Sequence, residues 1–88
     1  ERARVELFAA DLAGKQLSGM DLSGADVDKA DLSEADLSGA NLFRVHMSGI
    51  DGTGLKLTGA VALRASFKEA WLADADLSGM EAAKADFS

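Results

Sequence analysis

A five-residue period runs through the chain and constrains its fold more than any other feature. Ten of the twelve Leu residues occupy positions that leave a remainder of two on division by five. Ala fills ten of the seventeen positions divisible by five, eight of the ten Asp residues directly precede the Leu position, and eight of the nine Gly residues lie two places after it. The chain is therefore one continuous repeat.

Neither standard secondary structure has a period of five, because a helix buries a residue every 3.6 and a strand every second one. The pattern fits a chain in which every five residues form one short extended side followed by a turn. The Leu and the Ala two places before it would point inward, and the Asp, Ser and Gly positions outward. Gly suits the corner because it tolerates φ > 0.

This A(D/N)LSG pattern, continuous over residues 5–88, resembles the pentapeptide-repeat family. The resemblance implies an all-β fold, a right-handed quadrilateral β-helix with four pentapeptides per coil and a little over four coils. Residues twenty apart would then stack, about 4.8 Å from each other. We expect one domain over residues 1–88, with residues 1–4 as an irregular lead-in. Because the chain begins with Glu1 and not Met, we expect it to be a fragment of a longer, bacterial protein.

Composition excludes several classes of protein. The chain has 88 residues, no Cys, 48% hydrophobic residues and a net charge of −6. These values argue against a disulfide framework, a thiolate metal site, a membrane-spanning segment and general binding to nucleic acid or anionic lipid. We expect a cytoplasmic location, with which the lack of Cys is compatible.

No motif in the sequence supports catalysis or a cofactor. His46 has neither a second His nor a Cys to complete a catalytic pair. The segment 74–79 mimics the start of a calcium loop, but Ala85 stands where a bidentate Glu is needed. The segment 49–54 is Gly-rich but lacks the following Lys of a phosphate loop. We predict a protein that is not an enzyme and has no cofactor or metal.

One departure from the repeat falls in the predicted core. Gly52 replaces the central Leu of the column that also contains Leu12, Leu32 and Leu72. Leu55 and Ile50 are larger than the usual Ala and are expected to fill the space. Local compensation in the core is therefore favoured over a ligand cavity.

Stacking at twenty residues sorts the outward residues by side. One side is acidic and contains Asp11, Asp31, Glu34, Asp51 and Asp74, with Trp71 in the same column as three of them. These stacked like charges predict mild stabilisation in acid. The side centred on Leu17, Leu37, Leu57 and Leu77 is the most regular and predicts a flat structural wall.

A third side combines cations with apolar residues. Arg44, Arg64 and Lys84 share one corner column, with Arg4 on the same line, and Phe43, Val61 and Leu63 beside them are expected to face water. Apolar residues rimmed by Arg are typical of protein interfaces. The candidate interface comprises Phe43, Arg44, Val61, Leu63 and Arg64, with Trp71 as a separate contact candidate.

The ends of such a column predict a second kind of contact. A β-helix that stops leaves unpaired backbone groups and an open core. Family members pair end to end, and the resemblance therefore implies a homodimer stacked through the end near Phe87.

The leading functional hypothesis is a non-enzymatic interaction module, a rigid rod that presents its sides to a protein partner of unknown identity. The alternative, from the resemblance, is a DNA mimic that binds a type II topoisomerase such as gyrase and protects it from inhibitors. The acidic side and the net charge favour the alternative, whereas the cation column and the short rod weaken it.

Overall fold

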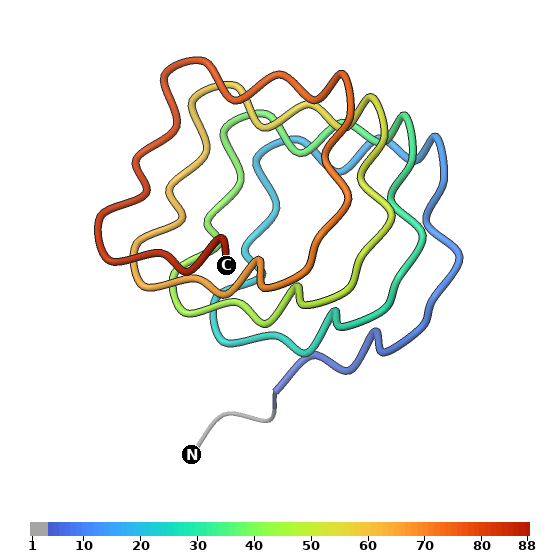
Figure 1. The fold of residues 1–88 in the computed structure, drawn as a ribbon, viewed down its shortest axis with the longest axis horizontal. Helices are drawn as coiled ribbons and strands as arrows, with labels where there is room; N and C mark the ends of the chain where they lie inside the picture. Colours follow the sequence, from blue (N-terminus) through green and yellow to red (C-terminus); the bar gives the residue numbers. More distant parts are fainter. Residues whose placement is uncertain (1–3) are drawn as a thin grey trace.

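The chain winds into a stack of square coils (Figure 1). The structure is a computed structural model that describes residues 4–88. Within this range there is no helix, and β pairing is confined to single-residue parallel bridges that join each residue preceding a central position to the one twenty places later, from Glu6↔Asp26 to Ser66↔Asp86. The predicted right-handed quadrilateral β-helix of a little over four coils is confirmed, with regular coils from Val5 onward.

Backbone hydrogen bonds hold each coil to the next on every side. On one side, the Leu32 N–H donates to the Asp51 carbonyl at 2.8 Å, and the Asp51 N–H donates back to the Ala30 carbonyl at 3.1 Å. A third bond joins the Glu34 N–H to the Thr53 carbonyl at 2.8 Å. Because these bonds link residues close to twenty apart, they fix which side chains share a column.

Each side ends in a tight turn whose corner residue has the left-handed backbone conformation. The Ala35 N–H, for example, donates to the Leu32 carbonyl at 3.0 Å, and Glu34 between them has a φ of 60°. A positive φ at this place is characteristic of a type II turn. Every fifth residue from Ala9 to Lys84 has a positive φ, and eight of these residues are Gly and eight are not. Gly at the corner is confirmed, but half of the corners place other residues in a conformation that L-amino acids disfavour.

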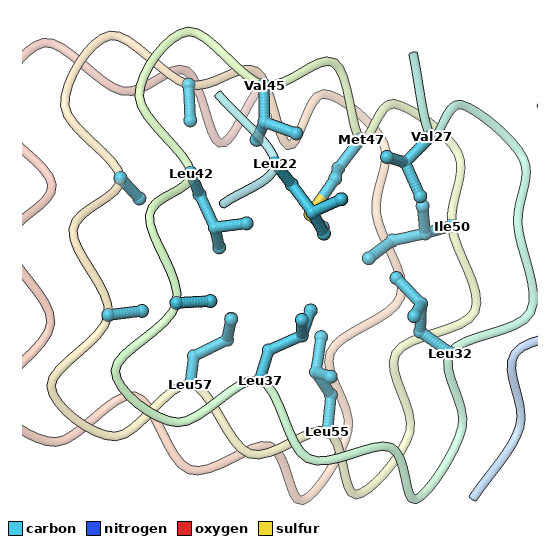
Figure 2. Close-up of a cluster of buried hydrophobic side chains, with 14 of the residues drawn as sticks. Leu22, Val27, Leu32, Leu37, Leu42, Val45, Met47, Ile50, Leu55 and Leu57 are labelled. Carbon is cyan, nitrogen blue, oxygen red and sulfur yellow. The ribbon is translucent and has the colours of Figure 1, made fainter. Parts of the chain in front are cut away.

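Inward side chains form the buried core of the middle coils (Figure 2). The buried core runs from Leu22 to Phe67 and consists of the Leu-position and Ala-position residues of the repeat. The end coils are more open, since Val5 and Met20 are each 42% exposed and Phe87 is 47% exposed. Phe87 stacks on Phe67 with ring centroids 5.0 Å apart. No helix in the described range is long and apolar enough to cross a bilayer.

Gly52 is required by packing and not by its backbone angles. A Cβ atom at this position would lie 2.9 Å from Leu72 Cδ2, 3.0 Å from the Trp71 carbonyl oxygen and 3.3 Å from Leu55 Cδ2. Leu55 and Leu72 therefore occupy the space that a central Leu would take. The predicted compensation in the core is confirmed for Leu55, and residues 4–88 enclose no pocket.

Candidate functional site

The cationic face is the side of the β-helix that contains Leu22, Leu42, Ala62 and Ala82. We define it by Phe43, Arg44, Val61, Leu63, Arg64 and Lys84. The bridge Asn41↔Val61 and the bond from the Arg44 N–H to the Leu63 carbonyl, 3.0 Å long, set the coils in register. Arg44, Arg64 and Lys84 are exposed corner residues with φ of 56°, 58° and 61°. The fold therefore stacks three cations in one outward column, as the sequence predicts.

None of these three cations is neutralised within the described chain. Between residues 4 and 88, ion pairs are formed only by Arg4, whose guanidinium lies 3.0 Å from Glu6 and 3.8 Å from Asp26. The hydrogen bond to Glu6 and the charge of that carboxylate raise the pKa of Arg4. Arg4 is thus directed at a neighbouring carboxylate, whereas the other cations of its predicted column have none.

The apolar part of the cationic face is less exposed than predicted. Phe43 is 39% exposed, and its ring lies 5.4 Å from the Arg44 guanidinium carbon in a cation–π contact. Val61 and Leu63 are partly buried. Phe43 therefore faces water as predicted, whereas Val61 and Leu63 are exposed only in part. Val61 and Leu63 lie in an inner coil, where residues of the coils on either side cover part of their surface.

The acidic face lies on the opposite side of the square. We define it by Asp11, Asp31, Glu34, Asp51 and Asp74. Asp11, Asp31 and Asp51 form one bridged column that ends in Trp71. Trp71 is 65% exposed. Because it shares the column of Asp51, it is separated from the cationic face by the width of the coil. At the adjacent corner, the Glu34 carboxylate lies over Gly54 and leaves no room for a side chain there.

Most carboxylates in the position before the central residue close a local turn. Asp31 Oδ1 accepts the Ser33 N–H at 3.0 Å and the Ser33 hydroxyl at 2.7 Å, and Asp51 makes the equivalent bonds with Thr53. The two bonds from Ser33 lower the pKa of Asp31. This geometry explains why the repeat contains Asp or Asn at this position and favours Ser two places later.

The predicted stabilisation in acid is wrong. The pKa values of Asp31, Asp36, Asp76 and Asp86 are all lowered, in each case first by the hydrogen bond from the Ser hydroxyl two places later. A lowered pKa means that the folded state stabilises the charged form of the carboxyl group. Asp31 is stacked between other carboxylates, whereas Asp36, Asp76 and Asp86 are not, and in all four the local hydrogen bonds favour the charged form, so acid should destabilise the fold.

The described residues contain no pocket and no group of three His, Cys, Asp or Glu placed to hold a metal ion. His46 is exposed in a column between Asp26 and Ser66. The candidate site is therefore a surface and not a cleft.

Sequence reasoning missed one exposed aromatic residue. Phe8 is 58% exposed and occupies the same place in its pentapeptide as Phe43. An aromatic residue at an outward position of the repeat was the signal that would have found it.

The chain belongs to the pentapeptide-repeat family. The model of pentapeptide repeats matches residues 3–39 and 35–70, in eight copies. Among solved structures, the pentapeptide repeat protein Rfr23 from the cyanobacterium Cyanothece is 27% identical with a TM-score of 0.58, and the alignment covers 97% of this chain and 62% of that one. A pentapeptide repeat protein from the Arabidopsis thaliana thylakoid lumen is 31% identical with a TM-score of 0.54, and covers 84% and 48%.

This chain thus spans less than two thirds of the length of either relative. No curated protein sequence matches it. Membership of the family establishes a structural repeat fold and leaves the partner to be argued from the surface.

Proposed function

We propose that this chain is a non-enzymatic interaction module, a rigid β-helix that presents its cationic face to a protein partner. The observation that carries the proposal is the unneutralised column of Arg44, Arg64 and Lys84 beside the partly exposed ring of Phe43. Arg and aromatic residues are enriched at protein interfaces, and Arg contributes strongly to binding energy.

The β-helix supports this role by fixing the surface before binding. The backbone of the cationic face is bonded to the coils on both sides, and the buried residues Leu42 and Ala62 anchor it from within. A surface that is already ordered loses less conformational entropy on association.

Site-specific photo-crosslinking tests the proposal. A photoreactive amino acid at position 63 is placed on the cationic face, and the matched control at position 58 lies on the flat wall, where Thr58 is exposed. After illumination in cells of the source organism, we expect a protein adduct at position 63 and much less at position 58. Equal labelling of the two positions, or no adduct at position 63, would contradict the proposal.

A second candidate is the DNA mimic that binds gyrase. The bridged column of Asp11, Asp31 and Asp51 favours it, because it presents carboxylates at a regular spacing along the coil axis. The Cα extents of 36 × 26 × 25 Å, however, describe a rod little longer than it is wide. A gyrase supercoiling assay with an inhibitor decides the matter. Protection by micromolar protein supports the mimic, and an unchanged inhibition curve removes it.

A further inference from the structure

The cationic and acidic faces have the same repeat distance, because equivalent inter-coil hydrogen bonds space both columns. Asp31↔Asp51 and Asn41↔Val61 are bridges between the same pair of coils. Strand spacing places successive members of either column about 4.8 Å apart. A partner with carboxylates at this spacing would meet Arg44 and Arg64 together, and a second copy of this chain has such a column.

The two columns also match in level. Asp31 and Arg44 belong to the coil 25–44, and Asp51 and Arg64 to the coil 45–64. In the next coil, the exposed Trp71 corresponds to Lys84, a pair suited to a cation–π contact. Asp31 and Arg44 are thirteen residues apart in a coil of twenty, so they differ in height by about two thirds of the coil spacing, roughly 3 Å, which a flexible Arg side chain spans.

The direction of the chain brings the matching columns face to face. The chain runs in opposite directions along opposite sides of a square coil (Figure 1). A copy translated sideways without rotation therefore places the column of Asp31 and Asp51 against the corner of Arg44 and Arg64. Asp21 and Glu81 lie at the two ends of the cationic face, while Asn41 and Val61 in its middle are uncharged.

The groups required for the contact are available. Asp31 and Asp51 use Oδ1 for their turns, and within residues 4–88 no hydrogen bond or ion pair joins Oδ2 of either carboxylate. Arg44 and Arg64 lack a carboxylate partner in the same range. Both sides of the contact thus present charges that the monomer leaves to solvent.

We infer that this chain associates side by side, with the cationic face of one copy against the acidic face of the next. The inference rests on the proposed interaction role and names its partner. The contact joins two different surfaces, so it is heterologous, and a pair of copies still has one free cationic face and one free acidic face. The assembly is therefore open, unlike an end-stacked dimer.

Two double variants separate the faces without disturbing the fold. Arg44→Gly/Arg64→Gly removes the cations and places Gly where φ is positive, as Gly24 does in the first coil of the same column. Asp31→Asn/Asp51→Asn removes the charges and keeps the Oδ1 acceptor, as Asn41 does with the Phe43 N–H. The matched control, Lys29→Gly/Asp36→Asn, makes one change of each kind on other parts of the surface.

Sedimentation velocity over a concentration series measures the association. At low salt we expect the unaltered chain and the control to form oligomers beyond the dimer, and 1 M salt to disperse them, because the Debye length falls to about 3 Å. Each face variant alone should associate about tenfold more weakly. An equimolar mixture of the two should form a 1:1 heterodimer, since one intact face of each kind remains and the chain of contacts cannot continue.

Other outcomes overturn the inference. A monomer at every salt concentration contradicts it, as does oligomerisation that both face variants leave unchanged, which would indicate end stacking. The proposed function is judged separately by the crosslink at position 63. An adduct with a different protein, together with a monomeric chain, would retain the interaction role and reject the second copy as the partner.

Discussion

At the corner of each coil, one residue has a positive φ whatever its identity. Gly59 has a φ of 68° and an open space where a Cβ would be, whereas Glu69 has a φ of 58° at the equivalent corner two sides further along the chain. For a residue with a Cβ, the left-handed conformation costs on the order of 1 kcal/mol. The backbone bonds of the coil evidently exceed that cost, because they impose the conformation on eight residues other than Gly.

Single substitutions at these two corners measure the cost of the left-handed conformation. Gly59→Ala should lower the free energy of unfolding by about 1 kcal/mol, since nothing within 4 Å would contact the new methyl group. Glu69→Gly should raise it by roughly 0.5 kcal/mol, with part of the gain offset by the flexibility of Gly in the unfolded chain. Urea unfolding measures both, and Glu69→Gln controls for the charge. A stabilising Gly59→Ala would contradict the argument.

Gly52 and Leu55 represent an exchange of volume between two inward positions. The repeat normally places Leu at the first position and Ala at the second, and here the large side chain belongs to the second. Leu55 is fully buried, and its Cδ2 lies 3.3 Å from where a Cβ on Gly52 would be. The core thus remains filled although its regular column is interrupted.

A double-mutant cycle tests the exchange. Leu55→Ala alone should cost about 2–5 kcal/mol by leaving a cavity. Gly52→Leu alone should cost about 1–3 kcal/mol by overpacking against Leu72. The double variant should be more stable than the sum of the two by at least about 1 kcal/mol. Denaturant unfolding of all four proteins gives the coupling energy, and additive costs would show that the two residues do not share one space.

At the scale of the pentapeptide, the turn determines how the fold responds to pH. Asp36 Oδ1 accepts the Ser38 N–H at 2.9 Å, and the Ser38 bonds lower the pKa of that carboxyl. A group whose pKa is lower in the folded state stabilises the fold above its ordinary value, 3.8, and this contribution is lost as the pH falls through the lower folded pKa. Asp76 has the same arrangement with Ser78.

We therefore expect the melting temperature to be nearly constant above about pH 4 and to fall below it. Asp36→Asn/Asp76→Asn should make the fall shallower, because an amide oxygen accepts the same N–H bond without titrating. Melting followed by circular dichroism between pH 2 and pH 7 tests this, with Ser38→Gly/Ser78→Gly as a variant that keeps both carboxylates and loses the hydroxyl bonds. A melting temperature that rises on acidification would contradict the lowered pKa values.

The period of five was sufficient to predict the coil and which side chains point inward, but not the contacts that the outward side chains make. It placed Asp51 above Asp31 and Arg64 above Arg44, because columns depend only on residue number. It did not predict that the bonds from Ser33 would lower the pKa of Asp31, which reversed the expected response to acid. It also overestimated the exposure of Leu63, since burial of an outward residue depends on the coils on either side of it.

At the scale of the whole molecule, stability should decrease from the middle coils outward. The Leu17, Leu37 and Leu57 amides each donate a 2.8 Å bond to the next coil, in one column. Leu37 and Leu57 are fully buried, whereas Leu17 in the first coil is only partly buried. A repeat protein is stabilised by its neighbouring units, and an end coil has fewer of them.

Hydrogen exchange followed by NMR measures this gradient. Although the three bonds have equal length, the Leu37 amide should exchange at least about tenfold more slowly than the Leu17 amide, with Leu57 close to Leu37. Phe87→Ala should accelerate exchange at Phe67, whose ring it covers, more than at Leu37. Equal rates at Leu17 and Leu37 would instead indicate that the 88-residue chain opens as one cooperative unit.

The twenty-residue coil also restricts how such a gene can change in length. Inserting or deleting one residue would shift every later inward position by one place and expose the core. A change of five residues would keep the core but turn all later sides by a quarter of a revolution, so that Lys84 would leave the column of Arg44 and Arg64. Only the gain or loss of a whole coil preserves both the interior and the pattern of charge outside it. A change in length by whole sides therefore preserves the fold, but only a change by whole coils also preserves the pattern of charge on the surface.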